Sequence, residues 1–134
     1  MQPKIPTIRV VAAVIERDGA YLITQRRPTA VLPLLWEFPG GKVESEQGET
    51  DACALRREVM HRLGVDVEAG TLISFVSHPY DQYVVELYLY ECRLIDGEPS
   101  TVNVNDFRWV QSHEFESYPF TPADEVSMTR LLGF

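Results

Sequence analysis

The sequence predicts a mixed α/β fold, meaning an α+β arrangement or a mixed β-sheet sandwiched by helices. Segments rich in β-branched and aromatic residues recur along the 134-residue chain, as β-strands do. One long helical pattern interrupts them, and strands and helices do not alternate as in a βαβ repeat. Because the sequence has no internal repeat and no long Pro/Gly/Ser-rich linker, we expect a single domain over residues 1–134.

The first strands form a predicted β-hairpin. Residues 8–16 are apolar on both alternating faces, which is expected of a central strand that is covered on each side. Asp18 and Gly19 are typical of a tight turn, which would lead into a second strand over residues 21–26. Further strands are predicted in a block at 65–76, at 83–92 and at 107–110.

Two helices are predicted. The longer one covers residues 50–63 and ends before Gly64, a residue type that commonly stops a helix in the left-handed conformation. The side chains expected to face the core recur at helical spacing and are Ala52, Leu55, Val59 and Leu63. The second helix covers residues 122–132, where Thr121 is suited to the N-cap and Pro122 to the first helical position.

Composition and charge exclude several classes of protein. The 20 acidic and 12 basic side chains give a net charge of −8, which disfavours non-specific contacts with nucleic-acid phosphates, so no nucleic-acid partner is expected. The apolar run at 10–15 is too short for a signal sequence or a membrane span, so we expect a cytoplasmic protein without a membrane partner. Cys53 and Cys92 form no CxxC pair, and both are expected to be reduced core residues.

A glycine-rich and charged segment leads into the longer predicted helix. It begins with the run Trp36-Glu37-Phe38-Pro39-Gly40-Gly41-Lys42-Val43-Glu44 and continues to Arg57-Glu58-Val59 and Leu63-Gly64-Val65. This segment resembles the Nudix box of MutT-type pyrophosphohydrolases, whose pattern is G-x5-E-x7-R-E-u-x-E-E-x-G-u with u an aliphatic residue. The matching positions are Gly41, Glu49, Arg57, Glu58, Val59, Gly64 and Val65.

The resemblance extends over most of the chain. Segments that look like the MutT and CTP-pyrophosphatase branch are Gln25-Arg26-Arg27, His78-Pro79-Tyr80, Gly97-Glu98-Pro99, Arg108-Trp109-Val110 and the run from Phe120 to Asp124. The resemblance implies a Nudix α/β/α sandwich around a mixed β-sheet. It also implies hydrolysis of a nucleoside diphosphate linked to a further group, with Mg²⁺ or Mn²⁺ as cofactor.

Two features depart from the family pattern. Seven residues separate Gly41 from Glu49 where the family has five, and His61 and Arg62 occupy the positions of the paired glutamates. On a helix, positions 58, 61 and 62 share one face about 100° wide. Three family carboxylates would bring a charge of −3 to this face, whereas Glu58, His61 and Arg62 sum to about zero. Because Mg²⁺ prefers carboxylate and phosphate oxygens, cation binding should be weaker by orders of magnitude.

The residues that would compensate are open to two interpretations. Glu44, Glu46 and Glu49 in the lengthened loop could replace the missing metal ligands, together with the Gly41 carbonyl that the resemblance implies and with substrate phosphates. Alternatively, Arg62 could replace one cation and bind phosphate directly. It could also pair with Glu58, which lies four residues earlier on the same helix.

Glu58 is the predicted metal ligand and base, and Arg57 the residue that orients it. The alternative for this pair is a solvated helix face with weak ion pairs, and the number of matched positions favours the functional interpretation. His61 could ligate a softer metal ion, but we favour a surface residue or a hydrogen-bond partner of Glu58.

Substrate binding is predicted at Arg26, Arg62, His78, Tyr80, Phe120 and Asp124. Asp124 matches a family position that reads the base, and a carboxylate can accept a hydrogen bond from an exocyclic amine. It also lies in the first turn of the predicted terminal helix, and both roles are compatible. Each aromatic residue, Phe75 included, is individually expected in the core, as are Trp36 and Phe38.

The leading hypothesis is a Nudix pyrophosphohydrolase with a non-standard metal site that acts on a nucleoside triphosphate or a related nucleoside diphosphate derivative. The main alternative is a catalytically silent Nudix fold that binds a nucleotide or a protein, motivated by His61 and Arg62. A third option, a module that reads damaged bases in DNA, is disfavoured by the net charge of −8. A homodimer is compatible with so small a domain.

Overall fold

The computed structural model describes residues 5–132 and contains seven strands, two α-helices and two short 3-10 helices. In chain order the elements are β1 (Thr7–Arg17), β2 (Ala20–Gln25), β3 (Trp36–Glu37), β4 (Gly40–Lys42), the 3-10 helix η1 (Ser45–Gln47), α1 (Asp51–Leu63), β5 (Asp66–Pro79), β6 (Val84–Asp96), β7 (Asp106–Val110), the 3-10 helix η2 (Ser112–Ser117) and α2 (Pro122–Leu132). The predicted mixed α/β class and each predicted strand and helix are confirmed, with ends shifted by up to a few residues.

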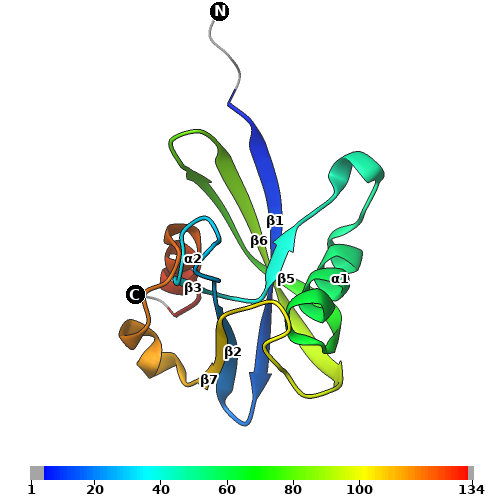
Figure 1. Ribbon diagram of the computed structural model, residues 1–134, viewed down its shortest axis with the longest axis vertical. Helices are drawn as coiled ribbons and strands as arrows, with labels where there is room; N and C mark the ends of the chain where they lie inside the picture. The colour runs from blue at the N-terminus through cyan, green and yellow to red at the C-terminus, as the bar shows by residue number, and fades with distance from the viewer. Residues whose placement is uncertain (1–4, 133–134) are drawn as a thin grey trace, which may run out of the picture.

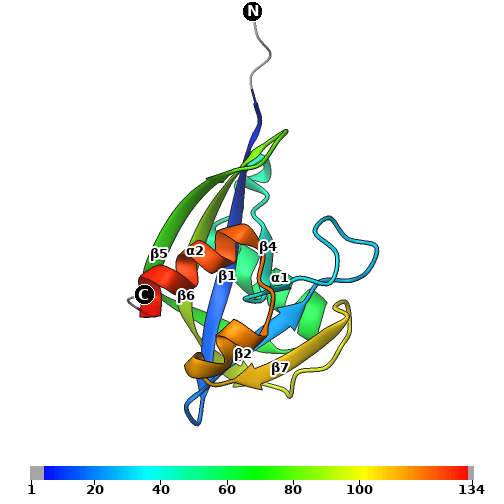
Figure 2. The same cartoon turned by 90° about the vertical axis from the view of Figure 1, so that its left-hand side faces the viewer.

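The strands form a mixed sheet in the order β3-β2-β1-β6-β5, with β4 paired to β1 and β7 paired to β2. Strand β1 runs parallel to β6 and antiparallel to β2 and β4. Helices α1 and α2 lie on opposite faces of this sheet (Figure 1). The view turned by 90° shows α2 crossing β5, β6 and β1, with β2 and β7 splayed away below it (Figure 2).

Strand β1 lies at the centre of the molecule, as its two apolar faces predicted. Val11 and Ile15 pack in the core beneath α1, whereas Ala12 and Val14 pack in the core beneath α2. The hairpin to β2 turns at Asp18 and Gly19, whose φ angles of 53° and 82° fit the left-handed geometry of a tight hairpin turn.

Helix α1 has the ends that the sequence predicted, but not the predicted inner face. Thr50 caps it by accepting a hydrogen bond from the Cys53 amide at 3.2 Å, and Gly64 ends it at a φ of 71°. Leu55, Val59 and Leu63 are buried as expected. Ala52 and Cys53 were predicted to be buried, but both are exposed, so these two predictions were wrong. The reason is that the buried face of the helix begins at Ala54, and the turn before it faces solvent. Cys92 is buried, and both cysteines are unbonded.

The glycine-rich segment before α1 forms two short strands, which the sequence did not predict. Strand β4 pairs with β1 so closely that a Cβ at Gly40 would lie 2.0 Å from the Val11 carbonyl oxygen. Trp36 and Phe38 are buried in the core, as predicted. The lengthened loop that follows contains η1, so the extra residues extend outward and leave β4 against α1. No helix within residues 5–132 is long and apolar enough to cross a membrane.

Candidate active site

Glu58, which matches the Nudix-box pattern, lies between helix α1 and strand β4. Glu58 is 9% exposed, and its carboxylate rests directly on Gly41, where an added Cβ would lie 2.4 Å from Oε2. The glycine is therefore required by this close approach, and any larger residue would displace the carboxylate. Helix and strand thus hold Glu58 in one place at the floor of the site.

Two guanidinium groups occupy the oxygens of Glu58. Arg57 Nη1 donates to Oε1 at 2.7 Å, and Arg62 Nε donates to Oε2 at 3.1 Å. Arg62 also lies 3.8 Å from a carboxylate oxygen of Glu37 on β3. The expected contact between Arg62 and Glu58 is therefore present, and the charge of this carboxylate is balanced within the protein.

Glu49 is held in the same network and stays ionised. Its two oxygens accept from Arg57 Nε at 2.7 Å and Arg57 Nη2 at 2.9 Å, and the Glu44 amide donates to Oε1 at 2.9 Å. The Arg57 hydrogen bonds, followed by that amide, lower the pKa of Glu49 to about 2. Arg57 thereby links Glu49 to Glu58, whereas Glu46 is exposed on η1.

A cavity of about 320 Å³ with a mostly apolar wall opens near Glu37 of β3. Its lining includes Arg26, Glu37, Tyr80, Tyr83 and Asp124 together with aliphatic residues of β1 and β6. A smaller cavity of about 150 Å³ shares Arg26, Glu37 and Asp124 with it and continues to Gly41 and Arg62. The combined space reaches from the first turn of α2 to the box helix, and its size and apolar wall are typical of small-molecule sites.

Asp124 ends this space on the α2 side. Its Oδ1 accepts from the Phe38 amide at 3.0 Å, and its Oδ2 accepts from the Thr121 hydroxyl. Burial, followed by the negative charge of Glu37, raises the pKa of Asp124 to about 7. Near neutral pH this carboxyl can therefore serve as either a hydrogen-bond donor or an acceptor.

The other predicted substrate residues are not all in one place. Arg26 donates to Glu37 at 3.1 Å and lines both cavities, and Tyr80 lines the larger one. His78 contacts the Tyr80 ring edge-on at a centroid distance of 4.7 Å but lines neither cavity. Phe75, expected in the core, is 40% exposed on β5, so that expectation was wrong.

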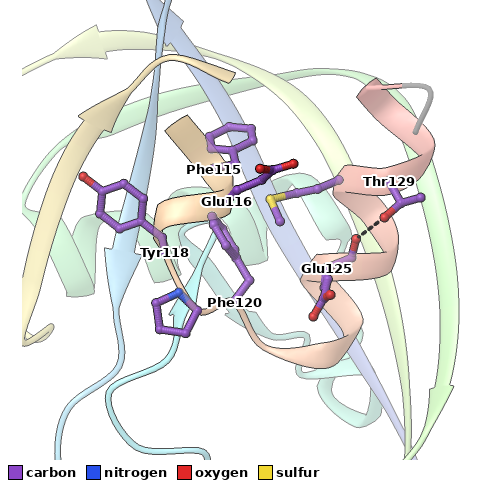
Figure 3. A pocket seen from close by; sticks show the side chains of 8 residues that line it. Phe115, Glu116, Tyr118, Phe120, Glu125 and Thr129 are labelled. Atoms are coloured by element: carbon purple, nitrogen blue, oxygen red, sulfur yellow. Dashed lines mark hydrogen bonds between the residues drawn. The ribbon is translucent and has the colours of Figure 1, made fainter. Parts of the chain in front are cut away.

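Phe120 faces a different cavity, of about 450 Å³, between η2 and α2. Figure 3 shows Phe115, Glu116, Tyr118 and Phe120 on one side of it and Glu125 and Thr129 of α2 on the other. Phe120 also packs against Phe115 at a centroid distance of 5.7 Å, so it belongs to the core beneath α2. This cavity contains no residue of the box.

Besides Tyr83, which lines the larger cavity, three polar residues of the site were not among the predicted ones. Glu37 links Arg26 to Arg62, and Arg27 Nη1 donates to Asn103 Oδ1 at 2.6 Å beside them. Glu37 stands in the run from Trp36 to Glu44 and lies three residues before Gly40, so its charge close to the glycine pair was an available signal. Asn103 lies 76 positions from Arg27 in the chain, and no local pattern indicates that contact.

Comparison with known proteins identifies the family. A profile of the NUDIX domain matches residues 10–130. The chain belongs to the Nudix family. It is 32% identical to the CTP pyrophosphohydrolase of Escherichia coli (strain K12) over 117 residues, which are 87% of this chain and 85% of that protein. It is 30% identical to an 8-oxo-dGTP diphosphatase of Haemophilus influenzae over 127 residues, 94% of this chain and 92% of that protein.

A solved structure supports the same assignment. The solution structure of the Escherichia coli ORF135 protein superposes with a TM-score of 0.80 at 30% identity, covering 96% of this chain and 91% of that one. The predicted family, the MutT-like branch and the Nudix sandwich are confirmed. The hydrolase class is supported as well, since both curated relatives are named for hydrolysis of a nucleoside triphosphate.

Nudix hydrolases generally use divalent metal ions such as Mg²⁺. Within residues 5–132, no group of three or more His, Cys, Asp or Glu side chains is arranged to hold a metal ion. Both oxygens of Glu58 and both of Glu49 already accept hydrogen bonds from arginines. The arrangement described therefore does not fit a metal held by a cage of protein carboxylates.

Proposed function

We propose that this Nudix protein hydrolyses a nucleoside triphosphate or a related nucleoside diphosphate derivative, with the base beside Asp124 and the phosphates directed toward Glu58. One observation carries the proposal. Arg26, Glu37 and Asp124 line both the larger cavity and the smaller one that reaches Gly41, so a single extended ligand can contact α2 and the box.

Recognition of the base is assigned to Asp124 and its neighbours. A protonated carboxyl can donate to a ring nitrogen or carbonyl of a base, and an ionised one can accept from an exocyclic amine. Tyr80 and Tyr83, whose rings stack at a centroid distance of 5.2 Å, supply an aromatic wall for the base. This division between apolar wall and single polar anchor favours a flat heterocycle.

The hydrolytic step is assigned to Glu58. Water attacks phosphorus, the new P–O bond forms as the anhydride P–O bond breaks, and Glu58 takes one proton of the water; the leaving group is the phosphate-bearing part beyond the broken bond, which is pyrophosphate for a nucleoside triphosphate. Arg57 holds the carboxylate in place at 2.7 Å, and Arg26 and Arg62 offset the charge on the phosphates. For the base to act, Arg62 must turn from Glu58 toward the incoming phosphate.

Mg²⁺ or Mn²⁺ enters this proposal as part of the substrate, the metal complex of the nucleotide. Gly41, Glu44, Glu49 and Glu58 remain the proposed protein ligands, and Glu49 and Glu58 would first have to release an arginine. No step above depends on such a ligand. A cytoplasmic location and a homodimer likewise remain proposals that rest on composition and size.

The second candidate function is nucleotide binding without turnover. It is favoured by the hydrogen bond between Arg62 and Glu58, which occupies the oxygen that would otherwise take a proton or a cation. The base cavity is the same in both candidates. The two differ only in whether Glu58 becomes available when phosphate arrives.

Phosphate and pyrophosphate release over a panel of nucleoside triphosphates, each with Mg²⁺ or Mn²⁺, separates the candidates. For an enzyme, Glu58→Gln should lower the rate about 100-fold or more, the usual size of a lost general base. The matched control is Glu68→Gln, because Glu68 is an exposed partner of Arg93 on β5 and lies outside the site. Nucleotide-induced thermal stabilisation with no release by the wild type would instead establish the binding module.

A further inference from the structure

A further cavity adjoins the site and does not include Asp124 in its lining. It measures about 190 Å³ and lies between the segment that follows β2, the last turn of α1 and the segment before β7. Its polar lining consists of Arg26, Arg27, His61, Arg62 and Asn103. Three guanidinium groups and an imidazole therefore surround one small space.

The charge around this cavity has a positive surplus. Arg26 and Arg62 have carboxylate partners in Glu37 and Glu58, but neither glutamate lines the cavity. Arg27 makes no ion pair among the residues that the structure describes, and its side chain instead donates to neutral Asn103. A protein of net charge −8 thus keeps an uncompensated cation at this position. Such a local surplus attracts anions that the remaining surface repels.

The side chains are already held for anion recognition. Asn103 accepts from Arg27 with Oδ1 at 2.6 Å, and its Nδ2 contacts His61 Nε2 at 2.5 Å, so one amide fixes two neighbours. Planar guanidinium groups bind phosphate oxygens through paired hydrogen bonds, and prior fixation reduces the entropy lost on binding. The volume is below the range of about 300–1,000 Å³ typical of whole drug-sized ligands. It suits a small anion.

The cavity adjoins the proposed nucleotide site through two shared lining residues. Arg26 lines all three spaces, and Arg62 lines this cavity and the one at Gly41. We propose that the cavity at Arg27, His61, Arg62 and Asn103 binds a pyrophosphoryl group without a divalent cation. The group is either free pyrophosphate or the terminal phosphates of a nucleotide; the nucleotide part of this inference rests on the proposed function.

In this cavity, basic side chains stand where the Nudix-box pattern has metal-binding carboxylates. His61 and Arg62 stand at the two glutamate positions of the box, and both line the cavity. Phosphate charge that a metal ion would neutralise is neutralised by arginine instead. Affinity should consequently survive chelation of metal and should fall as salt screens the guanidinium groups.

Calorimetric titration with inorganic pyrophosphate in EDTA tests the site. The wild type should bind, and Arg27→Gln and Arg62→Gln should each weaken binding about tenfold or more, the usual effect of losing a charged hydrogen bond. The matched control is Arg93→Gln, because Arg93 pairs with Glu68 on the exposed surface of β5 and β6. Circular dichroism and thermal unfolding establish that each variant is folded. Since Arg27 is exposed, its replacement should leave the fold intact.

Three outcomes decide the question. The site is supported if pyrophosphate binds in EDTA and if this binding depends on Arg27 and Arg62 but not on Arg93. If a nucleoside triphosphate also binds more tightly than its monophosphate, the terminal phosphates of a nucleotide occupy the site. Pyrophosphate that binds only with Mg²⁺, or equally to all variants, overturns it. The release assay is independent of this result, because a protein that hydrolyses nucleotides but ignores pyrophosphate in EDTA keeps its function and loses only this inference.

Discussion

The two ends of the site hold their carboxyl groups in opposite ways. At the proposed base end, neutral donors bind Asp124, and burial raises its pKa to about 7. At the proposed phosphate end, which contains Glu49 and Glu58, two hydrogen bonds from Arg57 lower the pKa of Glu49 to about 2. The same functional group therefore keeps its proton more readily at one end and is fixed as an anion at the other. The difference lies in the partners, since amides and hydroxyls carry no charge whereas guanidinium groups do.

The largest effect is expected from reversing the charge of the phosphate end. In the double variant His61→Glu/Arg62→Glu, three carboxylates share one face of α1 and Glu58 loses one of its guanidinium partners. Affinity for Mn²⁺ should rise about 100-fold or more, because two added anions and one removed cation each strengthen attraction at contact distance. Titration followed by Mn²⁺ electron paramagnetic resonance measures this directly.

A control on the same helix changes the charge equally. Arg56→Glu/Met60→Glu also makes the net charge more negative by three, by adding two carboxylates and removing one guanidinium, at two exposed positions of α1. Its affinity for Mn²⁺ should stay close to that of the wild type, since neither side chain adjoins Glu58. An equal rise in both double variants would show that net charge, rather than the geometry at positions 61 and 62, limits cation binding.

Local signals made α1 and its chemistry predictable. Thr50 and Gly64 stand next to the helix ends that they determine, so its bounds followed from single positions. The pairing of Arg62 with Glu58 followed from a spacing of four residues on a helix. The error at Ala52 arose because small residues carry little preference for either face, and it is Ala54 that belongs to the core cluster beneath α1.

The base end could be predicted only in part. The position of Asp124 in the first turn of α2 was readable, but its contact with the Phe38 amide joins residues 86 positions apart. Strands β3 and β4 are too short to carry an alternating pattern and exist because β2 and β1 pair with them. Arg27 and Asn103 meet through the same kind of long-range packing. Contacts between residues so far apart in the chain cannot be predicted from the pattern of neighbouring residues.

A smaller effect, on the stability of the base end, is expected from Asp124→Asn. The folded state keeps the proton of Asp124 up to about pH 7, whereas an unfolded chain releases it near its ordinary pKa of about 3.9. The wild type should therefore lose stability as pH rises from about 4 to 7, and the asparagine variant should not show this loss. The difference between the two free energies of unfolding should change by roughly 1–3 kcal/mol over that window.

Urea unfolding of both proteins at a series of pH values gives this difference without the contribution of other groups. Ion-paired carboxylates such as Glu49 and Asp51 have lowered pKa values and lose their stabilising contribution at acid pH, but they are present in both proteins. Asp81→Asn, at an exposed position, serves as the control. Parallel curves for the wild type and Asp124→Asn would mean that Asp124 is ionised in the folded state throughout.

The smallest effect is expected where the base end relies on packing. The hydroxyl of Tyr80 accepts one long hydrogen bond from the Ala123 amide at 3.4 Å, so Tyr80→Phe should cost less than about 1 kcal/mol of stability and leave nucleotide affinity nearly unchanged. Tyr80→Ala removes the ring as well and should weaken binding by about 1–3 kcal/mol, the range measured for stacking of a base on an aromatic side chain. Thermal unfolding and calorimetry of the pair separate ring from hydroxyl. If the phenylalanine variant lost as much affinity as the alanine variant, a hydrogen bond rather than an apolar wall would hold the base. Both ends of the site would then bind the ligand through polar groups, and they would differ only in the charge of those groups.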